Sequence, residues 1–360
     1  MRYYHIAVLP GDGIGAEVIP AGIEVLRAVA EVDAGFKVEM QSFDWGSNRY
    51  LREHEMMPKD GLQVLERGGF DGILLGPIGD PRIPDHITLW GLLLPIRQGF
   101  DQYVNLRPMR LLPGIASPLA GKGPADINMV CVRENTEGEY AGIGGRLYRG
   151  RGDEIAIQST VFTRGGTERI MRYAFEYARA HGRKKVTSAT KSNAMQYNMV
   201  FWDEVFAQVA AGYPDIQHEQ QLVDSLTARF VFRPESLDMI VASNLFGDIL
   251  TDLGAAVSGS MGIAPSANLN PERRYPSLFQ AIHGSAPDIA GRGIANPLGT
   301  IWSVQLMLDH LGESQAAALL MSAIEQVAAD KQSTTPDLGG RATTRDTTAA
   351  VCAALRRATR

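Results

Sequence analysis

The fold is decided by the stretch Leu237-Asp238-Met239-Ile240-Val241-Ala242-Ser243-Asn244-Leu245-Phe246-Gly247-Asp248-Ile249-Leu250-Thr251-Asp252. Residues 237–242 are a short apolar run of the kind that forms a buried strand. Residues 249–257 are typical of a helix, with Ser243 or Asn244 as its cap. A strand that passes directly into a helix is the repeating unit of α/β proteins. The stretch therefore predicts an α/β fold with polar side chains just beyond this strand.

Two aspartates, Asp248 and Asp252, leave the end of the predicted strand together. Residues four apart share one face of a helix, so we expect both carboxylates to point the same way. Paired carboxylate oxygens suit Mg²⁺ or Mn²⁺, and α/β enzymes bind ligands beyond their strand ends. Alternatively, both are acidic residues that the helix dipole favours near a helix start. The pair alone leaves both interpretations open.

Short apolar strands alternate with amphipathic helices along most of the chain, which indicates a largely parallel sheet. The predicted strands are residues 6–9, 70–75, 185–189, 216–223 and 237–242; the predicted helices are residues 16–29, 88–99, 198–210, 297–311 and 314–329. Residues 144–163 differ, because a Gly- and Arg-rich part precedes a β-prone part. This segment is either an arm that reaches a partner subunit or an ordinary edge hairpin.

Composition excludes several classes of protein. The chain has 360 residues, 45% of them hydrophobic and 21% charged, as expected for a globular protein of one large or two smaller domains. The net charge of −5 gives no sign of a nucleic-acid surface. No apolar run reaches transmembrane length, and the first residues lack the pattern of a signal peptide. Two widely separated cysteines, Cys131 and Cys352, suit a reducing compartment, so we expect a cytoplasmic protein with no membrane partner.

Three arginines lie where predicted elements end. Arg97 is near the end of a helix, whereas Arg107 and Arg133 close apolar strands. Guanidinium groups bind carboxylates through two parallel hydrogen bonds. Any one of them alone is more often a surface or ion-pair residue. Three together in an acidic chain suggest a small polycarboxylate ligand.

Other polar residues also follow predicted strands. Tyr140 and Lys191 can act as acid or base once neighbouring groups shift their pKa values, although each is more often structural. Asp224, after the strand of residues 216–223, is a third candidate metal ligand, or else an N-cap. The turn Gly11-Asp12-Gly13-Ile14-Gly15 lacks the dinucleotide-binding spacing, so a direct phosphate role stays open. The loop His283-Gly284-Ser285-Ala286-Pro287-Asp288 could let backbone amides approach a phosphate.

Taken in order, these motifs resemble the β-decarboxylating dehydrogenases, the family of isocitrate, isopropylmalate, homoisocitrate and tartrate/D-malate dehydrogenases. The resemblance covers nearly the whole chain. It is carried by Leu9-Pro10-Gly11-Asp12-Gly13-Ile14-Gly15, Asn105-Leu106-Arg107-Pro108, Arg133-Glu134-Asn135-Thr136-Glu137-Gly138-Glu139-Tyr140-Ala141-Gly142, residues 244–252 and residues 283–288.

The resemblance implies an isopropylmalate-dehydrogenase-like two-domain α/β fold with a mixed sheet, which is not a Rossmann fold. It implies a discontinuous cofactor-binding domain of residues 1–102 and 256–360. A second domain of residues 103–255 would hold substrate and metal, form the dimer, and carry a β-arm around residues 144–163. Such enzymes are homodimers with shared active sites.

The resemblance also implies roles for single residues. Asp224, Asp248 and Asp252 would bind the metal; Arg97, Arg107 and Arg133 the substrate carboxylates; and His283, Gly284, Ser285, Ala286, Asp288 and Asn296 the cofactor. Tyr140 and Lys191 would be the acid/base pair. Lys191 and Asp224 would come from the partner subunit.

The expected cofactor and substrate come from positions at which this chain differs from isocitrate and isopropylmalate dehydrogenases. Asp288-Ile289 stands where NADP-using isocitrate dehydrogenases carry lysine and tyrosine, which implies NAD, because a carboxylate repels a 2′-phosphate. Gly91 and Leu93 replace the Ser and Asn of isocitrate enzymes, and Trp90 replaces the Glu of isopropylmalate enzymes. Residues 84–103 and 43–47 resemble the tartrate/D-malate branch. Trp90 either fills the substrate pocket or belongs to the core.

We therefore expect oxidation and decarboxylation of small 2-hydroxy dicarboxylates with NAD and Mn²⁺ or Mg²⁺. The substrates would be D-malate, giving pyruvate and CO₂, and tartrates, with meso-tartrate giving glycerate and CO₂. K⁺ is also expected from the branch, although no residue identifies its site. The alternatives are a 3-isopropylmalate dehydrogenase, a catalytically silent regulatory subunit of the family, and a metal-dependent phosphate-handling protein, for which no P-loop is visible.

Overall fold

The computed structural model describes residues 1–358. They form two compact units, each built from separate parts of the chain. Unit 1 contains residues 1–102, 110–124 and those from Ala255 onward, and unit 2 contains residues 103–109 and 125–254. Residues 110–124, which we expected in the second domain, cluster with unit 1. Among residues 1–358, no helix is both long and apolar enough to cross a membrane.

Unit 1 is built on a mixed sheet. Its strands, in spatial order, are β2 (Phe36–Ser42), β1 (Arg2–Leu9), β3 (Gly72–Leu75), β12 (Ser277–Ala281) and β11 (Pro265–Leu269). Neighbouring strands run parallel except β11, which is antiparallel to β12. The central strands β3 and β12 are buried along their whole length, as expected for strands covered on both faces.

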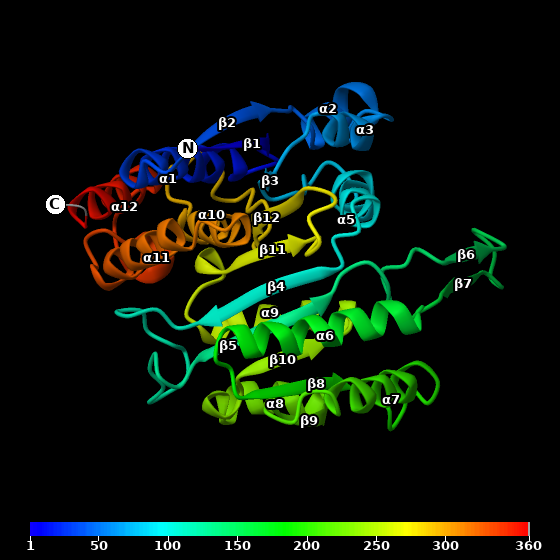
Figure 1. Ribbon diagram of the computed structural model, residues 1–360. Helices are drawn as coiled ribbons and strands as arrows, with labels where there is room; N and C mark the ends of the chain where they lie inside the picture. The colour runs from blue at the N-terminus through cyan, green and yellow to red at the C-terminus, as the bar shows by residue number, and fades with distance from the viewer. Residues whose placement is uncertain (359–360) are drawn as a thin grey trace. The chain divides into compact units, whose positions relative to one another are not determined.

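The helices of unit 1 come from both ends of the chain. They are α1 (Gly15–Asp33), α2 (Ser47–Glu53), α3 (Gly61–Arg67), α4 (Asp85–Thr88), α5 (Leu94–Gly99), α10 (Leu298–Leu311), α11 (Ser314–Ala329) and α12 (Thr344–Arg357), with short 3₁₀ turns at Met261–Ile263 and Pro336–Leu338. Helices α1, α10, α11 and α12 pack against one another, so the blue and red ends of the ribbon lie together (Figure 1).

Unit 2 also has a central sheet. Its strands, in spatial order, are β4 (Val104–Arg110), β5 (Asn128–Glu134), β10 (Met239–Ala242), β8 (Lys185–Thr190) and β9 (Gln217–Leu222). Strands β5, β10, β8 and β9 are parallel. In this register Arg133 lies opposite Ala242, and Thr190 lies opposite Leu222. The residues that follow these strand ends are therefore neighbours along one edge.

The helices of unit 2 are α6 (Arg164–Ala180), α7 (Asn198–Ala210), α8 (Val223–Phe232) and α9 (Asn244–Val257), with a 3₁₀ turn at Pro234–Ser236. Helix α6 packs on β5, β10 and β8, and α7 packs on α6 and β8. The fully buried side chains of α6 and α7 include Phe175, Trp202 and Phe206. Burying one large apolar side chain of this kind contributes ~1.5–3 kcal/mol to stability.

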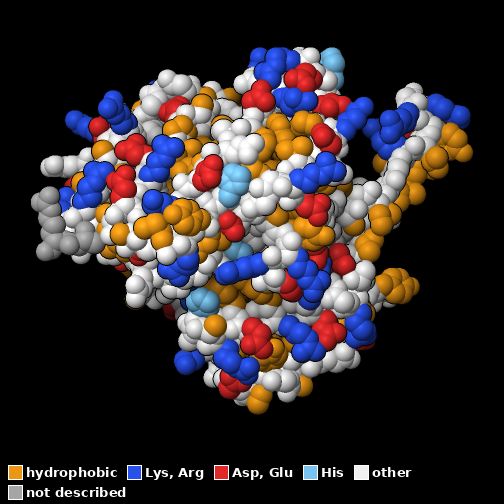
Figure 2. Space-filling view, turned by 45° about the horizontal axis from the view of Figure 1, so that its top comes forward, with side chains coloured by type: hydrophobic (Ala, Val, Ile, Leu, Met, Phe, Trp, Pro, Cys, Tyr) orange, Lys and Arg blue, Asp and Glu red, His pale blue; other side chains and the backbone are white. Residues whose placement is uncertain are grey.

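A separate hairpin projects from the rest of unit 2. It consists of β6 (Gly144–Leu147) and β7 (Ile155–Gln158), which pair antiparallel (Figure 1). The side chains of Leu147, Ile155 and Ile157 are exposed, and orange side chains follow the projecting segment in Figure 2. The predicted excursion is thus a hairpin, and its role as an arm stays a prediction.

Two predicted elements differ from the structure. The helix expected over residues 88–99 is interrupted by a π-helical turn at Leu89–Leu93, between α4 and α5. Leu92 and Ile96 from this region pack with Leu9 and Ile73 in one apolar cluster. The prediction that Arg107 closes a strand is wrong, because β4 continues through Pro108 to Arg110.

His310, at the end of α10, should make the stability of the protein pH-dependent. Burial, and then the nearby Arg273 guanidinium, lowers the pKa of His310 from 6.5 to about 4. Its Nε2 lies 3.1 Å from Ser277 Oγ. Between these pKa values the unfolded chain binds a proton at His310 and the folded chain does not, so stability falls as pH falls. We expect a loss on the order of 2 kcal/mol across this window.

The His310→Gln variant should lose this part of the pH dependence while keeping an acceptor for Ser277. Urea unfolding at about pH 7, 5.5 and 4.5 measures the free energy of unfolding directly. His181→Gln is the matched control, because His181 is exposed. A slope that is the same in wild type and His310→Gln contradicts the expectation.

Candidate active site

The parallel register of unit 2 gathers the polar residues predicted from the sequence at one edge of its sheet. Arg133 is at the end of β5, and Ser243 and Asn244 follow β10 beside it. Lys191 follows β8, and Asp224 comes just after β9. Because the carboxyl ends of parallel strands face one side, residues distant in sequence meet there.

Helix α9 carries both aspartates on one face. Ser243 is its cap: Phe246 N donates to Ser243 Oγ (3.4 Å), and Gly247 N donates to Ser243 O (2.8 Å). The first turn of α9 contains no acidic residue, so the interpretation of Asp248 and Asp252 as helix-start residues is wrong. Their side chains are 37% and 58% exposed, which leaves carboxylate oxygens accessible to a ligand.

Two buried arginines face these aspartates. Arg133 Nη1 donates to Asp248 Oδ1. Arg107 Nη2 lies 3.3 Å from the same oxygen, and Arg107 Nη1 lies 3.8 Å from Asp252 Oδ1. Arg107 Nη1 also donates to Thr251 Oγ1 at 2.6 Å. The structure thus brings together four of the residues predicted from the sequence.

The electrostatics of this cluster are set by two buried guanidinium groups and two carboxylates. Burial, and then the neighbouring Arg133 guanidinium, lowers the pKa of Arg107 to about 10, which still leaves it charged at neutral pH. Burial also raises the pKa of Asp252, and Arg107 opposes that rise. The two buried guanidinium groups repel each other, and the Asp248 carboxylate, which contacts both of them, offsets this repulsion.

Tyr140 lies in the same cluster. Its hydroxyl donates to Asp248 Oδ2 at 3.0 Å, and the Arg133 guanidinium carbon lies 5.5 Å from the centre of its ring. The loop that carries Tyr140 is held by Gly138, whose backbone pairs with Val161. The phenol oxygen is therefore held beside a carboxylate, and the ring lies beside a cation.

Lys191 and Asp224 form a separate pair. Lys191 Nζ donates to Asp224 Oδ1 at 2.7 Å, and this bond lowers the pKa of the carboxyl. Asp224 lies in the first turn of α8, whose cap is Leu222, so the N-cap interpretation is wrong. Within residues 1–358 no three His, Cys, Asp or Glu side chains are grouped to hold a metal. One chain therefore does not bring Asp224 to Asp248 and Asp252.

The candidate cofactor loop belongs to unit 1. Ile14 N donates to Ser285 O at 2.9 Å, and a Cβ at Gly13 would lie only 2.0 Å from that oxygen. Nothing lies within 4 Å of a Cβ built at Gly284. His283 Nε2 is buried without a hydrogen-bond partner, and burial lowers the pKa of this ring. A ligand at this loop would find open space and an unsatisfied polar atom.

The glycine-rich turn after β1 has a structural role that its sequence left open. Gly11 and Gly13 have positive φ angles of 70° and 52°, and the Asp12 carboxylate is buried among three donors. Ser47 Oγ (2.6 Å), Ser47 N (2.9 Å) and Gly79 N (2.8 Å) donate to it. Asp12 ties together three loops at the carboxyl ends of strands, a role that the sequence analysis missed.

The remaining predicted residues also lie in unit 1. Asn296 Nδ2 donates to Asp337 Oδ2 at 2.9 Å, and Asp288 is exposed. Arg97 is buried in α5. Trp90 lies in the π-helical turn and is 40% exposed, so its assignment to the core is wrong.

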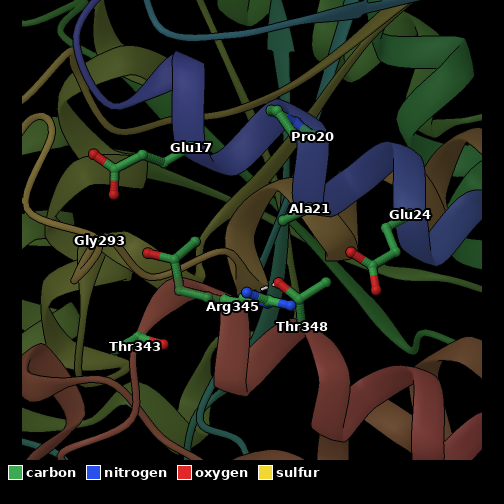
Figure 3. Close-up of a pocket in the computed structure, with 9 residues that line it drawn as sticks. Glu17, Pro20, Ala21, Glu24, Gly293, Thr343, Arg345 and Thr348 are labelled. Atoms are coloured by element: carbon green, nitrogen blue, oxygen red, sulfur yellow. Dashed lines mark hydrogen bonds between the residues drawn. The ribbon is translucent and has the colours of Figure 1, made fainter.

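A pocket of about 390 Å³ lies elsewhere in unit 1, between α1 and α12 (Figure 3). Glu17 and Glu24 line it from α1, Arg345 and Thr348 from α12, and Thr343 from the N-cap of α12. It contains none of the site residues predicted from the sequence.

The isocitrate/isopropylmalate dehydrogenase family model matches residues 5–352. The chain belongs to this family. It is 54% identical over 355 residues to a probable tartrate dehydrogenase/decarboxylase of Agrobacterium vitis, covering 99% of this chain and 97% of that protein. It is 53% identical over 359 residues to the decarboxylating D-malate dehydrogenase of Escherichia coli, covering 98% of both.

Structural comparison gives the same family. The crystal structure of isocitrate dehydrogenase from Methylococcus capsulatus matches with a TM-score of 0.87 and 34% identity, covering 98% of this chain and 99% of that one. The predicted family and its isopropylmalate-dehydrogenase-like fold are thus confirmed. The chain is accordingly an enzyme, a decarboxylating dehydrogenase of this family.

Proposed function

We propose that this dehydrogenase oxidises and decarboxylates small 2-hydroxy dicarboxylates, using NAD and Mn²⁺ or Mg²⁺. D-malate would give pyruvate and CO₂, tartrates would be oxidised, and meso-tartrate would give glycerate and CO₂. The observation that carries the proposal is the cluster on α9, where Asp248 lies between Arg107, Arg133 and Tyr140. Relatives named for tartrate and D-malate support the choice of substrate.

The carboxylates would hold the metal and the arginines the substrate. Asp248 and Asp252 offer partly exposed oxygens on one helix face, which fits a hard divalent cation. The partner subunit's Asp224 would be the third ligand. When bound, the cation supplies positive charge beside the substrate hydroxyl and carboxylate, which favours loss of the hydroxyl proton and of CO₂. Arg107, Arg133 and Arg97 would bind the two carboxylates.

Two side chains would handle the protons. The partner subunit's Lys191 would take the proton of the C2 hydroxyl, and NAD, when bound, would supply the acceptor for the hydride. Tyr140 returns one proton to the carbon that loses CO₂. D-malate and NAD⁺ then give pyruvate, CO₂ and NADH with no net change in protons. Each proton transfer from a positioned group contributes roughly 10²–10⁴ in rate.

The cofactor would bind at the loop of unit 1. His283, Gly284, Ser285, Ala286 and Asn296 would hold its adenosine half, and the exposed Asp288 would accept hydrogen bonds from the ribose. A negative charge at Asp288 disfavours the additional phosphate of NADP.

We also propose a homodimer in which the hairpin of β6 and β7 meets the partner. Lys191 and Asp224 would then complete the other subunit's site. Trp90 would narrow the space beside C3, and K⁺ would support activity.

The direct test is NADH production by the purified chain with Mn²⁺ across D-malate, the tartrate isomers, 3-isopropylmalate and isocitrate. We expect turnover with D-malate or a tartrate, little with the two larger substrates, and loss of activity with EDTA that Mn²⁺ restores. Higher activity on 3-isopropylmalate would replace the proposed substrate class. No NADH from any diacid would instead point to a silent regulatory subunit.

A further inference from the structure

One buried side chain links the parts of the α9 cluster. Asn244 is the first residue of α9 and is 1% exposed. Arg133 donates to Asn244 Oδ1 through both Nε (3.1 Å) and Nη2 (2.7 Å). Asn244 Nδ2 donates to Glu137 O at 2.9 Å. The amide therefore connects the end of β5 with the loop that carries Tyr140.

The orientation of this amide is fixed by chemistry. A guanidinium group has only donors, and a backbone carbonyl has only acceptor sites. The amide oxygen must therefore face Arg133, and its nitrogen must face Glu137, because the flipped amide would satisfy neither. Since Asn244 occupies Nε and Nη2, the group that Arg133 turns toward Asp248 is Nη1.

Gly247 shapes the other side of the same arginine. A Cβ at this position would lie 2.6 Å from both Cβ and Cγ of Arg133, and 3.1 Å from its Cδ. These atoms belong to the stem of the side chain and not to its flexible end. The first turn of α9 thus fits Arg133 twice, by hydrogen bonds to its head and by the absence of a side chain beside its stem.

We propose that Asn244 is a positioning residue for substrate binding. Asn244 holds Nε and Nη2 of the Arg133 guanidinium, so that Nη1, beside Asp248, is on the side that would meet a substrate carboxylate. Gly247 provides the space that this orientation needs. The inference rests on the proposed function, because Arg133 is there a substrate ligand. An arginine with no fixed partner would have to be ordered by each arriving substrate, which weakens binding.

The test starts with Asn244→Ala, for which we expect KM for D-malate to rise about tenfold, with kcat changed by less than about threefold and KM for NAD unchanged. Binding of succinate, a diacid without the reacting hydroxyl, should weaken by a similar factor in calorimetry without cofactor. Asn268→Ala is the matched control: it removes a buried amide that donates to Leu278 O in unit 1. It should leave both values unchanged.

A double-mutant cycle separates positioning from a general structural role. In an Arg133→Ala background, adding Asn244→Ala should change KM by less than about twofold, because the side chain that it orients is gone. Additive effects, or an unchanged KM in Asn244→Ala, overturn the inference.

Gly247→Ala is the second variant, and it decides the matter if Asn244→Ala does not fold. Alanine is the better helix former by roughly 1 kcal/mol, so propensity alone predicts a more stable helix. We expect instead the same tenfold rise in KM, from displacement of Arg133. If the wild-type protein oxidises no diacid, the proposed function is wrong. If the wild type is active and both variants keep the wild-type KM, only the positioning role of Asn244 is wrong.

Discussion

Mixing two inactive variants, Lys191→Met and Asp248→Asn, is expected to restore about a quarter of the wild-type activity. Random re-association gives heterodimers for half of the molecules, and one of the two sites in each heterodimer contains no substitution. The reason is geometric: Lys191 is bonded to Asp224, away from the cluster in which Asp248 lies between two arginines. The measurement is NADH production with D-malate after the two variants are unfolded and refolded together.

The matched control is a mixture of Lys191→Met with Asp224→Asn. Both residues would serve the partner's site, so every site in that heterodimer carries one substitution and the mixture should stay inactive. If each site were formed within one chain, neither mixture would recover. Activity in both mixtures, or in neither, contradicts a site shared in the proposed way.

Tyr140→Phe is expected to separate the two halves of the reaction. The first NADH per site should form at a rate within about threefold of wild type, whereas pyruvate release should slow by roughly 10²–10⁴. Only the second half needs a proton delivered to carbon, and the lost hydroxyl is the group that Tyr140 presents beside Asp248. Stopped-flow absorbance follows NADH, and quenched samples report pyruvate.

Tyr197→Phe is the control, because Tyr197 is 83% exposed and belongs to no proposed site. Mn²⁺ affinity should be measured in both variants, since Tyr140 also donates to a proposed metal ligand. Equal slowing of NADH and pyruvate in Tyr140→Phe would contradict the division of labour between Tyr140 and Lys191.

The elements with a clear hydrophobic period were predictable from the sequence. The helices over residues 198–210 and 314–329 were predicted with their observed limits. The strand that runs into α9, and the face shared by Asp248 and Asp252, also follow from local pattern. These features depend on residues that are close together in the sequence, so a local pattern is enough to predict them.

The contacts that assemble the site were not predictable in the same way. The two hydrogen bonds from Arg133 to Asn244 depend on the register between β5 and β10, which no local pattern specifies. The carboxylate of Asp12 meets Ser47 and Gly79 only after three loops have converged. The one sequence signal that could have suggested its role was an aspartate between the glycines of a turn that follows a strand.

The π-helical turn at Leu89–Leu93 has a consequence for how such enzymes can change. A π turn contains one residue more than the α turn that it replaces. Deleting one residue there would restore an uninterrupted α-helix and rotate Asp85–Thr88 by about 100° relative to α5, a change that no substitution can produce. The number of residues in this turn, and not only their identity, therefore determines which side chains of α4 lie on the same face as Arg97.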